Sequence, residues 1–216
     1  MSRIPWKFII WDWNGTLLDD VEAGLNSVNL MLNRRNLPPL TRSHYREIFG
    51  FPVRAFYQKA GFRLEDEDWD AMAREFHQNF LASDSIRLHD QAQMLLRHFQ
   101  ELGIGQAILS ASEQSILDRM LRAFGIAPYF TRICGVDNLY GSSKLDLGRR
   151  LLGQIDIPPK DILFIGDTLH DAEVAHQLGT DCLLISAGHQ SHERLCSSPF
   201  PVLRGLDELM RLHFPA

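Results

Sequence analysis

The sequence predicts an α/β protein, with a three-layer, Rossmann-like parallel sheet as its core and an inserted α-helical cap subdomain. Two observations predict this fold. In the second half of the chain, short apolar runs alternate with amphipathic helical patterns, which is typical of β-α-β units and a parallel sheet. In the first half, one apolar run precedes about ninety residues of mainly helical pattern, far more than a crossover connection requires.

The predicted strands are short apolar runs bounded by Gly, Asp or Ser. The first lies at 7–11, and the later ones at 105–110, 129–136, 161–167 and 181–186. Helical patterns separate the later runs. The strongest, at 113–124, places Ile116, Leu117, Met120, Leu121 and Phe124 on one stripe, and 144–153 and 169–178 show weaker versions. Either Ser110 or, more suitably, Ser112 would cap the helix at 113–124.

Four segments of helical pattern follow the first strand, at 21–35, 41–49, 53–62 and 68–82, and Pro and Gly residues separate them. We therefore expect residues 20–86 to form the inserted cap, and residues 1–19 and 87–216 to form the Rossmann-like core. A plain helical subdomain without a gating role is the alternative interpretation.

Composition excludes several classes of protein. The 216 residues are 45% hydrophobic and 23% charged, with a net charge of −5, which is ordinary for a globular protein and argues against nucleic-acid binding. The apolar runs are too short to cross a membrane, and the first residues do not form a signal peptide. Three scattered cysteines make no metal or disulfide pattern, which favours the cytosol. The oligomeric state is left open.

Polar residues follow the predicted strands where the strands end. Asp12 ends the first and Ser110 the second, Asp167 and Asp171 follow the run at 161–167, and Lys144 begins a predicted helix. Ligands bind beyond the carboxyl ends of the strands in an open parallel sheet, so these side chains are expected to share one rim. A single Asp there is a common turn former, but the combination indicates a site.

These residue types match the needs of phosphoryl transfer. Asp12 and Asp167 offer the oxygen ligands that Mg²⁺ prefers, and Lys144 offsets repulsion between carboxylate and phosphate. Ser110 and nearby backbone N–H groups, such as that of Ala111, would bind the phosphoryl oxygens. Asp12 could then attack phosphorus and form an aspartyl-phosphate.

The segments DWNGTLLD at 12–19 and GDTLHDAEVAHQLG at 166–179, with Ser110 and Lys144 between them, resemble the four motifs of the haloacid dehalogenase superfamily. The resemblance runs from about Phe8 to Leu203 and is greatest to its cap-bearing, phosphoglycolate-phosphatase-like members. It implies that Ser110 and Lys144 bind the phosphate.

The resemblance also implies roles for the acidic residues. Asp12 would be the nucleophile, and Asp167 a second carboxylate ligand of the metal. The backbone carbonyl of Asn14 would be a further metal ligand, and Asp171 would support the metal's water molecules. A small phosphorylated metabolite is the expected substrate, because closure of the cap leaves little room.

Two positions depart from the family pattern. Leu145 follows Lys144 where Pro is common. Asn14 stands where phosphatases of this group usually carry a second Asp, which protonates the leaving alcohol and then activates water. An amide has no titratable proton near neutral pH, and loss of a positioned acid–base typically costs about 10²–10⁴ in rate.

Asn14 leaves several interpretations open. The favoured one is a slow or specialised Mg²⁺-dependent phosphatase, best with leaving groups that need little protonation, such as aryl or acyl phosphates. Another group, His170 or a cap residue, could instead carry the proton. The alternatives are a weakened domain that binds a phosphorylated ligand or a partner, and a phosphotransferase or mutase.

Two further residue groups are candidates from position alone. In the cap, Arg54, Gln58 and Lys59 could select substrate anions. His189 and His192 follow the run at 181–186 and could approach the rim. A histidine metal site there is disfavoured, because no third ligand is apparent.

Overall fold

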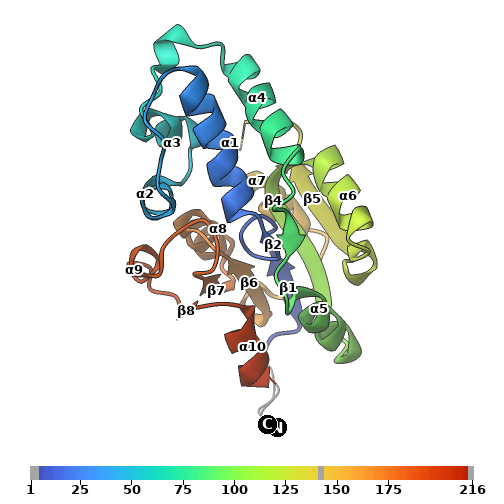
Figure 1. The fold of residues 1–216 in the computed structure, drawn as a ribbon. Coiled ribbons are helices and arrows are strands. Elements are labelled where there is room, and N and C mark those ends of the chain that lie inside the picture. The colour runs from blue at the N-terminus through green and yellow to red at the C-terminus, as the bar shows by residue number, and fades with distance from the viewer. Residues whose placement is uncertain (1–4, 141–143, 214–216) are drawn as a thin grey trace.

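A computed structural model describes residues 5–140 and 144–213. Its main sheet has six strands in the order β5-β4-β1-β6-β7-β8, and every neighbouring pair is parallel. The strands are β1 (Phe8–Trp11), β4 (Gly105–Glu113), β5 (Arg132–Val136), β6 (Ile162–Gly166), β7 (Asp181–Ile185) and β8 (Val202–Leu203). The predicted parallel α/β core is therefore confirmed (Figure 1).

Helices cover both faces of the sheet. One face packs on α5 (Ala92–Glu101), α6 (Gln114–Ala123) and α10 (Leu206–His213), and the other on α7 (Leu145–Leu152), α8 (Leu169–Leu178) and α9 (His192–Leu195). Strand β1 shows why: Ile9 and Trp11 point into the first apolar cluster, and Phe8 and Ile10 into the second. Because both faces are buried, the strand is apolar at every position rather than at alternate ones.

The chain leaves the core at β2 (Leu18–Asp19) and returns at β3 (Arg87–Leu88), and these two strands pair with each other antiparallel. Between them lie α1 (Val21–Arg34), α2 (Arg42–Ile48), α3 (Val53–Lys59) and α4 (Trp69–Leu81). They enclose a separate apolar cluster and sit above the carboxyl ends of the core strands (Figure 1). Short 3-10 turns lie at Leu64–Asp66, Ala127–Tyr129 and Pro159–Asp161.

The structure differs from the sequence expectations in a few elements. Strand β4 continues to Glu113, past the expected end at Ser110, with an irregular register after Leu109. Helix α5 and the two-residue strands β2, β3 and β8 were not predicted. Such strands carry too few residues for an alternating pattern, so only their pairing with a distant strand defines them.

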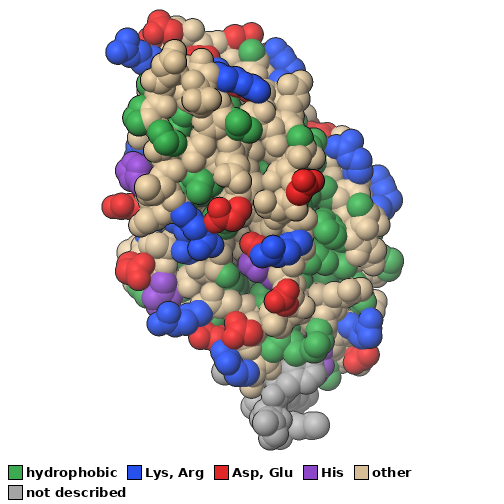
Figure 2. All heavy atoms as spheres, viewed as in Figure 1, with side chains coloured by type: hydrophobic (Ala, Val, Ile, Leu, Met, Phe, Trp, Pro, Cys, Tyr) green, Lys and Arg blue, Asp and Glu red, His purple; other side chains and the backbone are tan. Residues whose placement is uncertain are grey.

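The surface carries charges of both signs (Figure 2). On the face shown in Figure 2, Lys and Arg side chains are interspersed with Asp and Glu. None of the helices in the described part of the chain has the length and apolar character needed to cross a membrane. Cys134, Cys182 and Cys196 are free thiols.

Candidate active site

Two carboxylates are brought together by neighbouring strands. Asp12 directly follows β1 and Asp167 directly follows β6, which pairs with β1. The backbone N–H of Asp12 extends this ladder and donates to the carbonyl of Ile165 at 2.8 Å. Asp12, Asp167 and Asp171 are all buried, and one carboxylate oxygen of each lies within 4.8 Å of the others. The carboxylates therefore lie close together at one edge of the sheet, as predicted.

Lys144 lies beside this cluster. It precedes α7, is 2% exposed, and its Nζ donates to Oδ1 of Asp12, to Oδ1 of Asp171 at 2.6 Å and to the carbonyl of Leu109 at 3.1 Å. Burial alone would lower the pKa of the ammonium, but the two carboxylates outweigh it and raise that pKa. The group is thus a fixed positive charge beside Asp12.

Asp171 is held by the start of α8. Its Oδ2 accepts from the N–H of Asp167 at 3.1 Å, and from the N–H and Oγ1 of Thr168 at 2.9 and 2.7 Å, forming a capping box. Burial would raise its pKa, but Lys144 and these hydrogen bonds hold it below the usual value. Both oxygens are therefore occupied, and the side chain fixes Lys144 and the Asp167 loop.

Asp12 and Asp167 are buried acids whose charged forms would be stabilised by a cation. Burial raises the pKa of Asp12 to about 6 despite Lys144, and burial and the neighbouring acids raise that of Asp167 well above normal. The backbone packs tightly around Asp167: a Cβ on Gly15 would lie 2.1 Å from its Oδ2, and one on Gly188 2.2 Å. A hard divalent ion would favour the ionised carboxylates, which burial and mutual repulsion disfavour.

Ser110 lies on the same rim. It is 1% exposed, and its Oγ accepts from the N–H of Ser112 at 3.0 Å. A hollow of about 40 Å³ brings Ser110 and Ala111 together with Asp12, Lys144 and the other carboxylates. We call this hollow the anion pocket; it also includes Asn14, Phe49, Phe51, Asp167, Thr168, Asp171 and His189.

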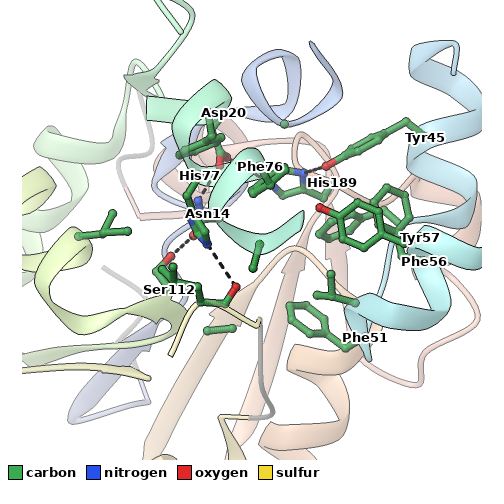
Figure 3. A pocket seen from close by; sticks show the side chains of 18 of the residues that line it. Asn14, Asp20, Tyr45, Phe51, Phe56, Tyr57, Phe76, His77, Ser112 and His189 are labelled. Atoms are coloured by element: carbon green, nitrogen blue, oxygen red, sulfur yellow. Dashed lines mark hydrogen bonds and ion pairs between the residues drawn. The ribbon is translucent and has the colours of Figure 1, made fainter. Parts of the chain in front are cut away.

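The amide of Asn14 is fixed at both ends. Its Oδ1 accepts from Oγ of Ser112 at 2.6 Å, and its Nδ2 donates to Oδ2 of Asp20 at 2.6 Å (Figure 3). Oδ1 of Asp20 accepts from the N–H of Gly15 at 2.8 Å. Ser112 is therefore not the helix cap, which is Glu113 instead. The side chain at position 14 contributes orientation without a titratable proton.

His189 joins this network from the far end of the sequence. Its Nε2 pairs with Asp20 at 3.2 Å, its Nδ1 meets the hydroxyl of Tyr45 at 3.0 Å, and its backbone N–H donates to Asp167 at 2.6 Å. Burial would lower its pKa, but Asp20 and Asp167 raise it to about 9. Sequence reasoning did not find Asp20 or this role of His189, since 169 residues separate the pair.

The other candidates lie outside the acid cluster. Arg54 is exposed, and its guanidinium stacks over the ring of Trp69 at 4.9 Å. His170 is largely buried against the ring of Phe51, with the ring centroids 4.7 Å apart, and burial lowers its pKa. His192 pairs with Oγ of Ser186 at 3.1 Å. Gln58 and Lys59 are exposed on α3.

The cap is joined to the core beside the site. Arg46 on α2 donates to three backbone carbonyls of the loop after β7: to Gly188 at 2.9 Å, to Gln190 at 2.8 Å and to Ser186. The side chain of Gln190 donates to the carbonyl of Phe49, whose ring stacks on His189 at 4.7 Å. The cap is thereby held over the anion pocket.

Comparison with known proteins agrees with the motifs. A curated N-acetylmuramic acid 6-phosphate phosphatase of Pseudomonas aeruginosa is 25% identical, covering 88% of this chain and 85% of its own. A phosphoglycolate phosphatase of Caulobacter vibrioides is 26% identical, covering 84% and 79%. A haloacid dehalogenase-like family hydrolase of Streptococcus pneumoniae shares the fold, with a TM-score of 0.80, 19% identity and coverage of 97% and 100%.

The family assignment rests on the length of the match as well as on the motifs. The sequence profile of the haloacid dehalogenase-like hydrolases matches residues 9–185, which include the cap and the acid cluster. The chain belongs to the haloacid dehalogenase-like hydrolases.

Proposed function

We propose that the protein is a Mg²⁺-dependent phosphatase that hydrolyses a small phosphomonoester through an aspartyl-phosphate. The observation that carries the proposal is the buried group of Asp12, Asp167 and Asp171 with Lys144 beside it, at the end of the central strands. Two relatives are named as phosphatases of small phosphorylated acids, which supports the same reaction class.

The residues present fit a magnesium ion. Asp12 and Asp167 would be its carboxylate ligands, the backbone carbonyl of Asn14 a further ligand, and Asp171 would support bound water while positioning Lys144. When bound, the ion would neutralise the phosphate and lower repulsion toward the Asp12 carboxylate.

Asp12 is the proposed nucleophile. Its carboxylate oxygen forms a bond to phosphorus, and the bond from phosphorus to the ester oxygen breaks, so the leaving group departs with that electron pair. Water then attacks phosphorus, releases inorganic phosphate and regenerates the carboxylate. Lys144 would offset the charge that builds on the phosphoryl oxygens, which Ser110 and the N–H of Ala111 would bind.

Residues 20–86 would act as a cap that closes over the substrate and excludes water. The hydrogen bonds of Arg46 to the core loop support this role, since they hold α2 at the mouth of the anion pocket. A cap in this place favours a small metabolite over a phosphoprotein. The free cysteines support the cytosol as the proposed location.

The test is phosphate release from a panel of phosphomonoesters, with and without Mg²⁺, by the native protein and by Asp12→Asn. We expect Mg²⁺-dependent turnover that Asp12→Asn abolishes. Asp19→Asn is the matched control. It removes a carboxylate from the same segment, but that carboxylate pairs with Arg87 outside the site. Intact-protein mass must verify Asn14, since Asn-Gly deamidates to a carboxylate. Full activity in Asp12→Asn would overturn the mechanism.

A further inference from the structure

A second, larger hollow adjoins the anion pocket. Its volume is about 140 Å³, and Asn14, Phe49, Phe51, Ala111 and His189 line both spaces. A group that occupies the larger hollow would therefore lie next to a phosphoryl group in the smaller one. We call the larger space the ring pocket.

The walls of the ring pocket are apolar and largely aromatic. Most of its lining residues from the cap are Phe, Tyr or Trp, including Phe56, Tyr57, Trp69, Phe76 and Phe80. Ile116 and Met120 of α6 close it on the core side. In Figure 3, Asn14 and Ser112 lie on one side of the space, and Phe51, Phe56 and Tyr57 on the other. Apolar cavities of about 150 Å³ are known to bind benzene.

The charges around the ring pocket do not suit a second anion. None of the described residues that line it is Lys or Arg. The positive charge of His189 is matched by its ion pair with Asp20. His77 donates through Nε2 to the carbonyl of Leu139 at 3.3 Å, and burial lowers its pKa, which disfavours the charged form of the ring. A carboxylate on the substrate's organic part would lose its hydration without a partner.

The chemistry at position 14 points the same way. The amide of Asn14 is held between Ser112 and Asp20 and has no proton to give to a departing oxygen. An alkoxide is a poor leaving group without that proton, whereas a phenol, with a pKa of about 10, departs readily as its anion. The absent acid and the apolar walls therefore both favour an ester whose leaving group is a phenol.

We propose that the substrate is an aryl phosphomonoester whose uncharged aromatic ring occupies the ring pocket, with its phosphoryl group in the anion pocket. The proposal rests on the phosphatase function proposed above. In the reaction, the oxygen of Asp12 bonds to phosphorus, the bond from phosphorus to the aryl oxygen breaks, and the phenolate leaves with the electron pair. It takes up a proton from water once released.

The first test compares ligands with the native protein in Mg²⁺. Phenylphosphonate should bind at least about 30-fold more tightly than methylphosphonate by calorimetry, because only the former buries a ring. Phenyl phosphate should be hydrolysed with a higher kcat/KM than 2-phosphoglycolate or glycerol phosphate. Equal binding of the two phosphonates, or a preference for the carboxylated ester, would overturn the inference while leaving the phosphatase assignment intact.

The second test alters the wall. Ile116 is half-buried, so Ile116→Lys places a cation in the ring pocket, and we expect phenylphosphonate affinity to fall at least about tenfold. Ser115→Lys adds the same charge to the exposed side of α6 and should change nothing. Ala73→Leu, which narrows the pocket from α4, should weaken the phenyl ligand and spare the methyl one. Unchanged selectivity in folded Ile116→Lys and Ala73→Leu would refute the site.

The two proposals fail in different ways. If no ester is turned over yet phenylphosphonate binds preferentially, the phosphatase function falls and the ligand class stands. If alkyl esters are hydrolysed as fast as aryl esters, and Asp12→Asn abolishes both activities, only the proposal of an aryl substrate in the ring pocket is refuted.

Discussion

Restoring the acid at position 14 is the sharpest perturbation of this site. In Asn14→Asp, a carboxyl group replaces an amide whose Nδ2 lies 2.6 Å from Oδ2 of Asp20. Two charges roughly 4 Å apart repel by about 4 kcal/mol at an effective dielectric constant of ~20. That repulsion, which the positive charge of His189 paired with Asp20 would partly offset, would raise the pKa of the new carboxyl by at most about 3 units, from about 3.9 to no more than roughly 7.

A carboxyl group that titrates near neutrality is suited to general acid catalysis. We therefore expect Asn14→Asp to raise kcat/KM for alkyl phosphates by about 10²–10⁴, equivalent to roughly 3–5 kcal/mol of barrier, and for aryl phosphates far less. Because the acid acts in its protonated form, the alkyl activity should decline above about pH 7. Phosphate release from both ester classes across pH measures this.

A second variant tests whether Asp20 sets that pH dependence. Asn14→Asp combined with Asp20→Asn removes the repelling charge, so the decline in alkyl activity should move to lower pH. If Asn14→Asp left the ratio of alkyl to aryl turnover unchanged, position 14 would have no part in proton transfer and the argument from the amide would fail.

Three more expectations follow from the geometry. Burial raises the pKa of Asp12 to about 6, so folding disfavours its charged form. Because Mg²⁺ binds the charged form, calorimetry should show Mg²⁺ affinity falling about tenfold per pH unit below 6. The metal-free protein should lose stability as pH rises from about 4 through 6, since the unfolded chain then releases a proton that the folded protein keeps. Gly15→Ala should lower the affinity for Mg²⁺ at least about tenfold, because the new Cβ would lie 2.1 Å from Oδ2 of Asp167. Gly103→Ala has the same φ of 73° but open surroundings, so it should leave the affinity for Mg²⁺ unchanged. Arg46→Ala should cost about 1–3 kcal/mol in urea unfolding, because buried loop carbonyls lose their donor.

The sequence was informative where local pattern determines structure. Runs such as Phe8–Trp11 and Ile162–Gly166 are apolar throughout because both sheet faces are covered, and Asp12 and Asp167 stand out because they end those runs. Since β1 and β6 pair directly, their end residues had to meet. The strand order was not predicted, but the rim was, because the carboxyl ends of parallel strands lie at the same edge of a sheet.

Contacts between distant polar residues were not predictable in this way. The ion pair of Asp20 with His189 depends on how the loop after β7 meets the cap, and neither residue has a distinctive local pattern. Helix α5 was missed although Leu95, Leu96 and Phe99 are buried on it. Arg54 illustrates the converse: its guanidinium stacks on the ring of Trp69, a wall of the ring pocket, but Arg54 itself lines neither pocket.

The roles proposed for position 14 and for the cap would together allow hydrolysis without an acid at position 14. At the leaving group, a phosphatase can either protonate the departing oxygen or accept only esters whose oxygen departs unprotonated. Here the amide of Asn14 is locked by Ser112 and Asp20, and the cap encloses a space suited to a ring. If leaving groups are restricted in this way, the rate should depend steeply on the acidity of the phenol. A series of substituted phenyl phosphates would reveal this dependence in the native protein, and Asn14→Asp should flatten it.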